Sequence, residues 1–239
     1  MVYFHEIDIL KGIAVICMII FHIYYFPNQY GYREFDYKTF PLQTIAKIAQ
    51  LIFITCVGIN LVLSNQKKDV YPWNRILNLV FLASCMSLFS YFIFESKYIK
   101  FGILHFIAFV SILLLPFINN IESIHRITFF FGILFLLLKK KPEIFLGVKQ
   151  PFAFIMGFYN DRYYSIDHFS ILPWIFVVLS GVYIGHYLVD TNYTSSIDIS
   201  KHSIMNTFAK IGKRSLEIYI LHWVILYIYY VHIYKSMIH

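Results

Sequence analysis

Residues 8–26, DILKGIAVICMIIFHIYYF, are the clearest indication of how this chain folds. The stretch is an almost unbroken apolar run, of the length that a helix needs to cross a hydrocarbon layer about 30 Å thick. Asp8 and Lys11 stand at its head, and His22 lies inside its far half. A signal peptide would lack these groups and would be followed by a small-residue cleavage site, so we expect the run to remain as a permanent span.

Further apolar blocks follow along the chain. Together with the first, the blocks are 8–26, 42–64, 76–94, 101–118, 124–138, 169–189 and 214–233. The chain is 59% hydrophobic and 14% charged, whereas about a quarter of a soluble domain is charged. Backbone groups in lipid must be hydrogen-bonded internally, so each block should be a helix. The sequence predicts an all-α, polytopic integral membrane helical bundle of about seven transmembrane helices, with residues 1–239 forming a single domain.

The segments between the blocks give less information. Residues 139–167 contain Pro142, Pro151 and Gly157 around a short apolar run, which indicates a surface or re-entrant segment. The polar tract 191–203 should be a loop. Lys and Arg are almost equally numerous on the two sides of the predicted bundle, so charge counting does not decide the topology.

The formal charge of +7 comes from basic residues in the gaps between blocks, as in KKDVYPWNR (67–75) and KKK (139–141). They form no basic face, so anionic lipid headgroups are expected as partners rather than nucleic acid. The cysteines, Cys17, Cys56 and Cys85, are odd in number and lie inside apolar blocks. Neither a disulfide framework nor a metal site is predicted.

Titratable groups inside a span are costly and indicate function by default. Those in this chain are Asp8, Lys11, His22, His105, His168, Glu217 and His222. Lys11 and His22 are eleven positions apart, which places them on one helix face within roughly 20° and about 16.5 Å apart along the axis. An extended pantetheine arm has a length of that order. The spacing thus suggests coenzyme A, although Lys11 as a snorkelling lysine and His22 as a structural histidine are the alternatives.

Two further clusters come from later blocks. His105 in FGILHF (101–106) and Asp167–His168 before the sixth block belong on the side where the first helix ends, if the spans alternate. The alternatives are an interfacial belt for both histidines and an N-cap for Asp167.

In GKRSLEIYILHW (212–223), Ser215, Tyr219 and His222 share one helix face. His222 held by that face as a core residue is the structural alternative.

These segments resemble a known family. EIDILKGIAVICMIIFH (6–22) is similar to the opening helix of the membrane acyltransferase superfamily, in which an Arg or Lys is followed after ten residues by a His. Four more segments resemble, in the same order, the bacterial and archaeal relatives of heparan-alpha-glucosaminide N-acetyltransferase. They are FITCVGINLVLS (53–64), FGILHFIA (101–108), YYSIDHFSILPWIFVVLSGVYIG (163–185) and GKRSLEIYILHW (212–223).

The resemblance implies an enzyme that takes an acetyl group from cytosolic acetyl-CoA and delivers it across the cell or plasma membrane. The acceptor would be a glucosamine-type amine or a sugar hydroxyl, and the amino terminus would be cytoplasmic. The chain departs from the lysosomal enzyme in two respects. By this resemblance, His22 stands at a position where the lysosomal enzyme has an Asn. The loop that follows, YYFPNQYGYREFDYKTF (24–40), contains no His, so the family's catalytic loop histidine is not carried over.

Direct transfer is the mechanism that we predict, with His22 as the general base on the attacking OH or NH. His105 or Tyr219 would hold the developing oxyanion or the acceptor. The candidate residues are, for catalysis, His22, His105, Tyr219 and His222; for coenzyme A, Asp8, Lys11, Lys213 and Arg214; and for the acceptor, Asp167 and His168.

Two other classes of protein remain as alternatives. A proton- or ion-coupled transporter would use the buried His and Asp as an ion path, and inverted repeats, which would favour it, are not visible. A receptor or assembly protein would not need a lysine and a histidine on one face at this spacing. A homodimer is compatible with the sequence.

Overall fold

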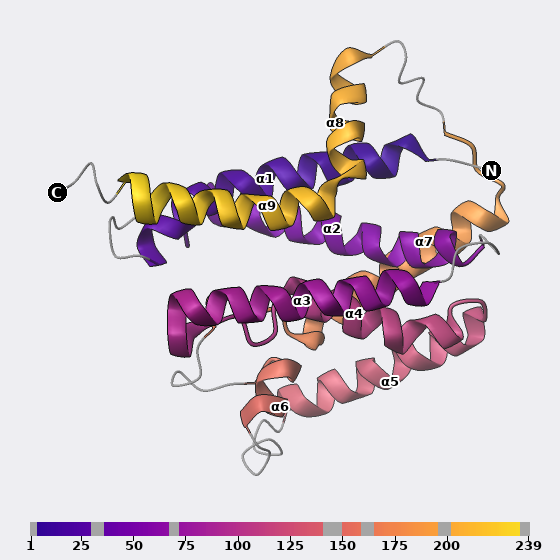
Figure 1. Cartoon of the computed structure of the whole chain (residues 1–239). Coiled ribbons are helices and arrows are strands. Elements are labelled where there is room, and N and C mark those ends of the chain that lie inside the picture. Colours follow the sequence, from indigo (N-terminus) through magenta and orange to yellow (C-terminus); the bar gives the residue numbers. More distant parts are fainter. Residues whose placement is uncertain are drawn as a thin grey trace. The chain divides into compact units, whose positions relative to one another are not determined.

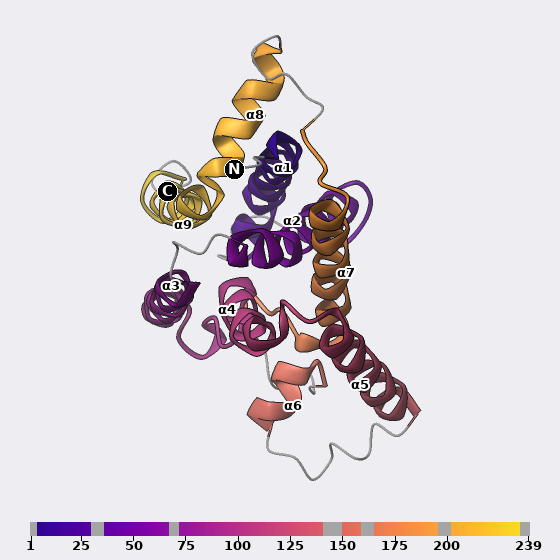
Figure 2. The same ribbon diagram turned by 90° about the vertical axis from the view of Figure 1, so that its right-hand side faces the viewer.

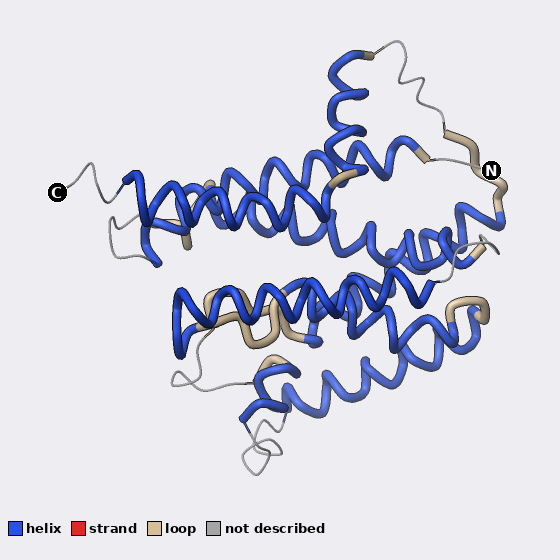
Figure 3. Tube along the Cα trace, in the orientation of Figure 1, coloured by secondary structure: helices blue, strands red, loops and turns tan. Residues whose placement is uncertain are grey.

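The computed structural model describes residues 4–29, 36–66, 72–140, 150–158, 165–195 and 202–234. Their regular structure is helical, and no strand occurs among them beyond an isolated bridge between Phe101 and His168 (Figure 3). The helices are α1 (His5–Gln29), α2 (Leu42–Asn65), α3 (Pro72–Phe94), α4 (Ile103–Leu114), α5 (Ile121–Lys140), α6 (Gln150–Met156), α7 (Ile171–Asp190), α8 (Ser203–Lys213) and α9 (Ser215–Ile228).

Each predicted apolar block contains a helix, which confirms the all-α membrane bundle. Helices α1, α2, α3, α5 and α7 are long and apolar enough to cross a membrane. The fourth block forms the shorter apolar stretch Ile103–Phe117. In the last block the 14 residues of α9 continue into η5, a π-helical segment of 6 residues (Tyr229–Tyr234). For these two blocks a complete span stays a prediction.

Two predictions about connecting segments can be compared with the structure. The only helix described within 139–167, apart from the end of α5, is α6, whose 7 residues are too short to cross a membrane, as expected. Residues 191–195 of the predicted loop are non-helical. Residues 141–149, 159–164 and 196–201 lie outside the described part of the chain.

The search for apolar blocks does not predict α8. Its apolar residues Ile204, Phe208 and Ile211 lie at helical spacing, but polar residues separate them. The segment is therefore amphipathic, and its mean hydropathy is too low to mark a span.

The chain forms two compact units. Unit 1 comprises Met1–Cys56 and Asn192–His239, and unit 2 comprises Val57–Thr191. Within unit 1, α9 packs along α1, whereas α8 runs across α1 (Figures 1 and 2). The two helices cross closely at Gly12 and Gly212, which have no side chains. A side chain at Gly12 would overlap the backbone of Phe208, and one at Gly212 would overlap the backbone of Asp8.

Unit 2 is built on pairs of packed helices, with α3 against α4 and α5 against α7. Gly58 near the end of α2 lies directly against the backbone of α7 at Val178 and Gly181, which is the small-residue packing typical of membrane helices.

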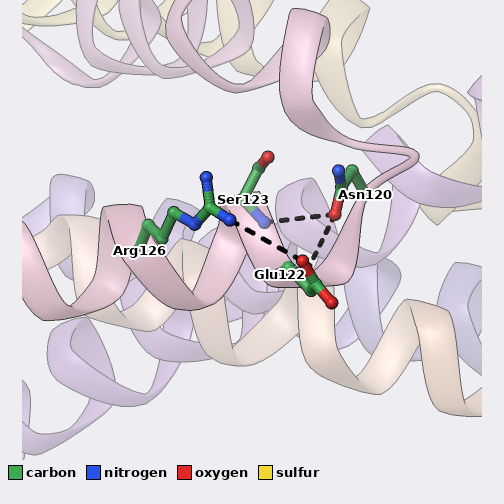
Figure 4. Close-up of polar contacts among 4 residues, drawn as sticks. All are labelled: Asn120, Glu122, Ser123 and Arg126. Atoms are coloured by element: carbon green, nitrogen blue, oxygen red, sulfur yellow. Dashed lines mark hydrogen bonds and ion pairs between the residues drawn. The ribbon is translucent and has the colours of Figure 1, made fainter.

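Helix α5 begins with a polar cap (Figure 4). The side-chain oxygen of Asn120 accepts hydrogen bonds from the backbone N–H groups of Glu122 and Ser123, at 3.0 and 3.2 Å. Arg126 pairs with Glu122 one turn later at 3.7 Å. Both of these charged side chains are largely exposed, so the pair adds little to stability.

Candidate active site

An ion pair occupies the start of α1. The Nζ of Lys11 lies 2.5 Å from Oδ1 of Asp8, and the i, i+3 spacing brings both side chains to one face. Asp8 is 6% exposed, and the Lys11 side chain is 17% exposed. A lysine that simply snorkelled to headgroups would not be paired with a buried carboxylate, so this geometry favours a fixed cationic group.

The α1–α8 crossing brings two more cations to this region. Gly212 lies against the backbone of α1 from Asp8 to Gly12, and Lys213 and Arg214 follow it directly. Both side chains are exposed. The predicted coenzyme A residues are thus gathered at one end of unit 1, on segments about 200 positions apart in the chain.

His22 lies eleven residues further along α1 and is half-buried. Its Nδ1 is 2.9 Å from the carbonyl oxygen of Met18. A carbonyl oxygen only accepts hydrogen bonds, so Nδ1 carries the proton and donates it. The lone pair of the neutral ring is therefore on Nε2, which is the atom a general base needs.

Helix α9 supplies the surroundings of His22. The ring centroid of His222 lies 4.9 Å from that of His22, and the ring of Tyr219 lies 5.4 Å from His222. Ser215, Tyr219 and His222 are 9%, 7% and 5% exposed. The three residues lie on one face of α9, as predicted, and the structure shows that this face is buried.

Trp223 is a neighbour of His22 that was not predicted from the sequence. Its ring centroid lies 5.8 Å from that of His22 and 4.7 Å from that of Phe26, and it is 2% exposed. A tryptophan deep within an apolar block, away from the membrane interface, is the signal that could have identified it.

The other predicted residues lie in unit 2. His105 has both ring nitrogens engaged: Nδ1 accepts from the N–H of Gly102 at 3.3 Å, and Nε2 lies 3.1 Å from the hydroxyl of Ser87. Since Nδ1 is the acceptor, Nε2 carries the proton and donates to Ser87. This arrangement fixes the start of α4, a role that the sequence did not predict for His105, and its catalytic role stays a prediction.

Asp167 caps a helix, as the N-cap alternative predicted, but the helix is α4 and not α7, which follows Asp167 in the chain. Its Oδ2 accepts from the N–H of Ile103 at the start of α4, at 3.2 Å. His168 lies against the ring of Phe154, with centroids 3.7 Å apart. Both residues therefore join segments within unit 2, and their predicted role in binding the acceptor stays a prediction.

A bundle of apolar helices long enough to cross a membrane defines an integral membrane protein. The family model "Heparan-alpha-glucosaminide N-acetyltransferase, catalytic" matches residues 4–224. The chain belongs to that family, as the resemblance predicted, and is a membrane acetyltransferase. No match was found among curated proteins or among solved structures.

Proposed function

We propose that this membrane acetyltransferase takes its acetyl group from acetyl-CoA on the cytoplasmic side of the cell membrane. The group passes to an amine or a hydroxyl of a saccharide-type acceptor on the opposite side, and the amino terminus is cytoplasmic. The family match supports an acetyl donor and a glucosamine-like acceptor. Because the match extends through both units, we propose that residues 1–239 act as one acyltransferase domain.

One observation carries the proposal: α1 holds a paired lysine near its start and a histidine in the base-competent tautomer eleven residues later. The axial separation of about 16.5 Å fits an extended pantetheine arm between a phosphate at Lys11 and a thioester at His22.

The cationic end of unit 1 suits the coenzyme A phosphates. Lys11 is paired with Asp8. Lys213 and Arg214 directly follow Gly212, which lies in close contact with α1. Lysines bind phosphate as point charges, and arginine binds it as a planar fork. Asp8 restrains Lys11 so that less side-chain entropy is lost when phosphate binds.

Bound acetyl-CoA supplies an activated thioester carbonyl. His22 takes the proton of the acceptor OH or NH on Nε2 while the acceptor's lone pair forms the new bond to the carbonyl carbon. The carbon–sulfur bond breaks with its electron pair on sulfur, and His22 returns the proton to that sulfur. The Met18 carbonyl keeps the ring oriented and stabilises the transient imidazolium.

The remaining candidates are assigned as follows. Tyr219 and His222 line the surroundings of His22 and hold the acceptor or the developing oxyanion. For His105, a role in holding the oxyanion or the acceptor stays a proposal, as does acceptor binding for Asp167 and His168.

The test is binding of acetyl-CoA to the purified protein in detergent, measured by calorimetry. Saturable binding that weakens when coenzyme A lacks its 3′-phosphate supports the proposal. Absence of acetyl-CoA binding, together with proton or ion flux in liposomes, would instead support a transporter. Transfer is then measured with glucosamine and other amino sugars as acceptors.

A further inference from the structure

Three buried ring nitrogens beside His22 make no hydrogen bond with any described residue. They are Nε1 of Trp223 and both Nδ1 and Nε2 of His222. A buried polar group left without a partner costs about 1–3 kcal/mol, and the N–H of a buried tryptophan usually finds one. The cluster therefore indicates a polar ligand.

The chemistry of the indole limits what that ligand is. The Nε1–H of Trp223 is a donor only, so its partner must supply an acceptor atom. A carbonyl oxygen is such an atom, and it becomes a stronger acceptor as negative charge develops on it during acyl transfer. His222 in its neutral form offers one donor and one acceptor, which suits the hydroxyl or amine of an acceptor beside that carbonyl.

The distance between the two rings fits this arrangement. A reacting carbonyl placed between a base and an oxyanion donor needs a hydrogen bond of about 3 Å at each end. The centroids of His22 and Trp223 are 5.8 Å apart, so a carbonyl bound beside one ring also lies near the other. Phe26 packs edge-to-face against Trp223 at 4.7 Å, which fixes the direction of the indole N–H before the reaction.

We propose that the Nε1–H of Trp223 donates a hydrogen bond to the carbonyl oxygen of the acyl group and stabilises the charge that develops there during transfer. This inference rests on the proposed acetyl transfer with His22 as base. As the acceptor's lone pair bonds to the carbonyl carbon, the carbonyl π pair shifts to oxygen, and it returns as the carbon–sulfur bond breaks. Trp223 exchanges no proton, and the acceptor's proton passes through His22 to sulfur.

The first test measures the NMR signal of the indole N–H. The full chain contains Trp73, Trp174 and Trp223 as its only tryptophans, so labelling with 15N-indole tryptophan gives at most three N–H signals. Trp223→Phe assigns the signal of interest. If that variant does not fold, Trp73→Phe and Trp174→Phe assign it by elimination. The probes are acetyl-CoA and S-ethyl-CoA, in which a methylene replaces the carbonyl.

The indole proton of Trp223 should move downfield with saturating acetyl-CoA and stay in place with S-ethyl-CoA, whereas Trp73, which is 49% exposed, should not respond. A water molecule as the partner would give the same signal with both probes, and that result overturns the inference. Acetyl-CoA that binds without moving the signal overturns this inference alone. Absence of binding overturns the proposed function as well.

Kinetics give a second test. Trp223→Phe keeps the ring and removes the donor, so kcat should fall by about a hundredfold to a thousandfold while the Kd for acetyl-CoA stays within about twofold. Trp73→Phe is the matched control and should retain native turnover. Native turnover in a folded Trp223→Phe variant contradicts the proposal.

Discussion

The hydroxyl of Tyr230 in η5 donates a hydrogen bond of 2.7 Å to the carbonyl oxygen of Ile23 in α1. Pro27 lies inside α1, four residues after Ile23, and has no N–H, so this carbonyl lacks its intrahelical donor. Tyr230 supplies the missing donor. Ile23 directly follows His22, so the bond also fixes the helical turn that carries the proposed base.

Removing this hydroxyl should destabilise unit 1. We expect Tyr230→Phe to lower the free energy of unfolding by about 0.5–1.5 kcal/mol, because a partly buried carbonyl loses its donor. Thermal unfolding in detergent measures the change. Tyr187→Phe, which alters a side chain that is 66% exposed, is the matched control and should have little effect.

A double-mutant cycle with Pro27→Ala tests the cause. An alanine restores the N–H at position 27, so Tyr230→Phe should cost less in that background than in the native protein. Equal costs in both backgrounds would show that the hydroxyl does not substitute for the missing donor.

His22→Gln should separate catalysis from structure. Glutamine has similar bulk and can still hydrogen-bond, but it cannot take up a proton near neutral pH. We expect acetyl-CoA binding and thermal stability near native values, with turnover reduced by about a hundredfold or more, or roughly 2.7 kcal/mol in the barrier.

The matched control for His22 is His232→Gln, because His232 is exposed and also lies in unit 1. It should retain native turnover. A folded His22→Gln variant with native turnover would remove His22 from the mechanism and favour His222 as the base.

Replacing Lys213 and Arg214 together with alanine should weaken acetyl-CoA binding by calorimetry. The loss should be larger at low salt, because ions screen exposed charges. Lys139→Ala, which removes an exposed charge from α5 in unit 2, should leave the Kd unchanged. An unchanged Kd in the double variant would place the coenzyme A phosphates elsewhere.

Gly212→Ala should open the α1–α8 crossing. A methyl group at this position overlaps the backbone of Asp8 and Gly12, which cannot move aside as a side chain could. We therefore expect lower thermal stability and weaker acetyl-CoA binding. Gly132→Ala is the matched control, since nothing lies within 4 Å of its added methyl, and it should be neutral or stabilising. Equal effects of the two substitutions would contradict the close crossing.

His168 should make stability depend on pH. Burial lowers the pKa of His168 from its ordinary value of 6.5 to about 4. Below pH 6.5 the unfolded chain binds a proton that the folded protein does not, so the free energy of unfolding should fall as the pH drops from about 6.5 towards 4. Above pH 6.5 this group should contribute no pH dependence.

Thermal unfolding of the native protein and of His168→Asn across this pH range measures that contribution. The variant should lose less stability on acidification than the native protein. Parallel curves for the two proteins would mean that His168 is not held neutral by the fold.

Local periodicity in the sequence was enough to predict several features of this protein. The apolar blocks predict helices because lipid leaves the backbone no other hydrogen-bond partner. The Asp8–Lys11 pair follows from i, i+3 spacing, and the buried face of Ser215, Tyr219 and His222 follows from the helical repeat of α9. The resemblance to the family also rests on sequence alone and agrees with the family match.

The contacts between distant segments became known from the three-dimensional fold. It placed α8 across α1, put Trp223 beside His22 and joined Asp167 to the start of α4 instead of its own helix. The physical reason is that such contacts depend on shape complementarity and on unsatisfied polar groups in segments far apart in the chain. Helical periodicity fixes the face on which a residue lies, but not the partner that covers it.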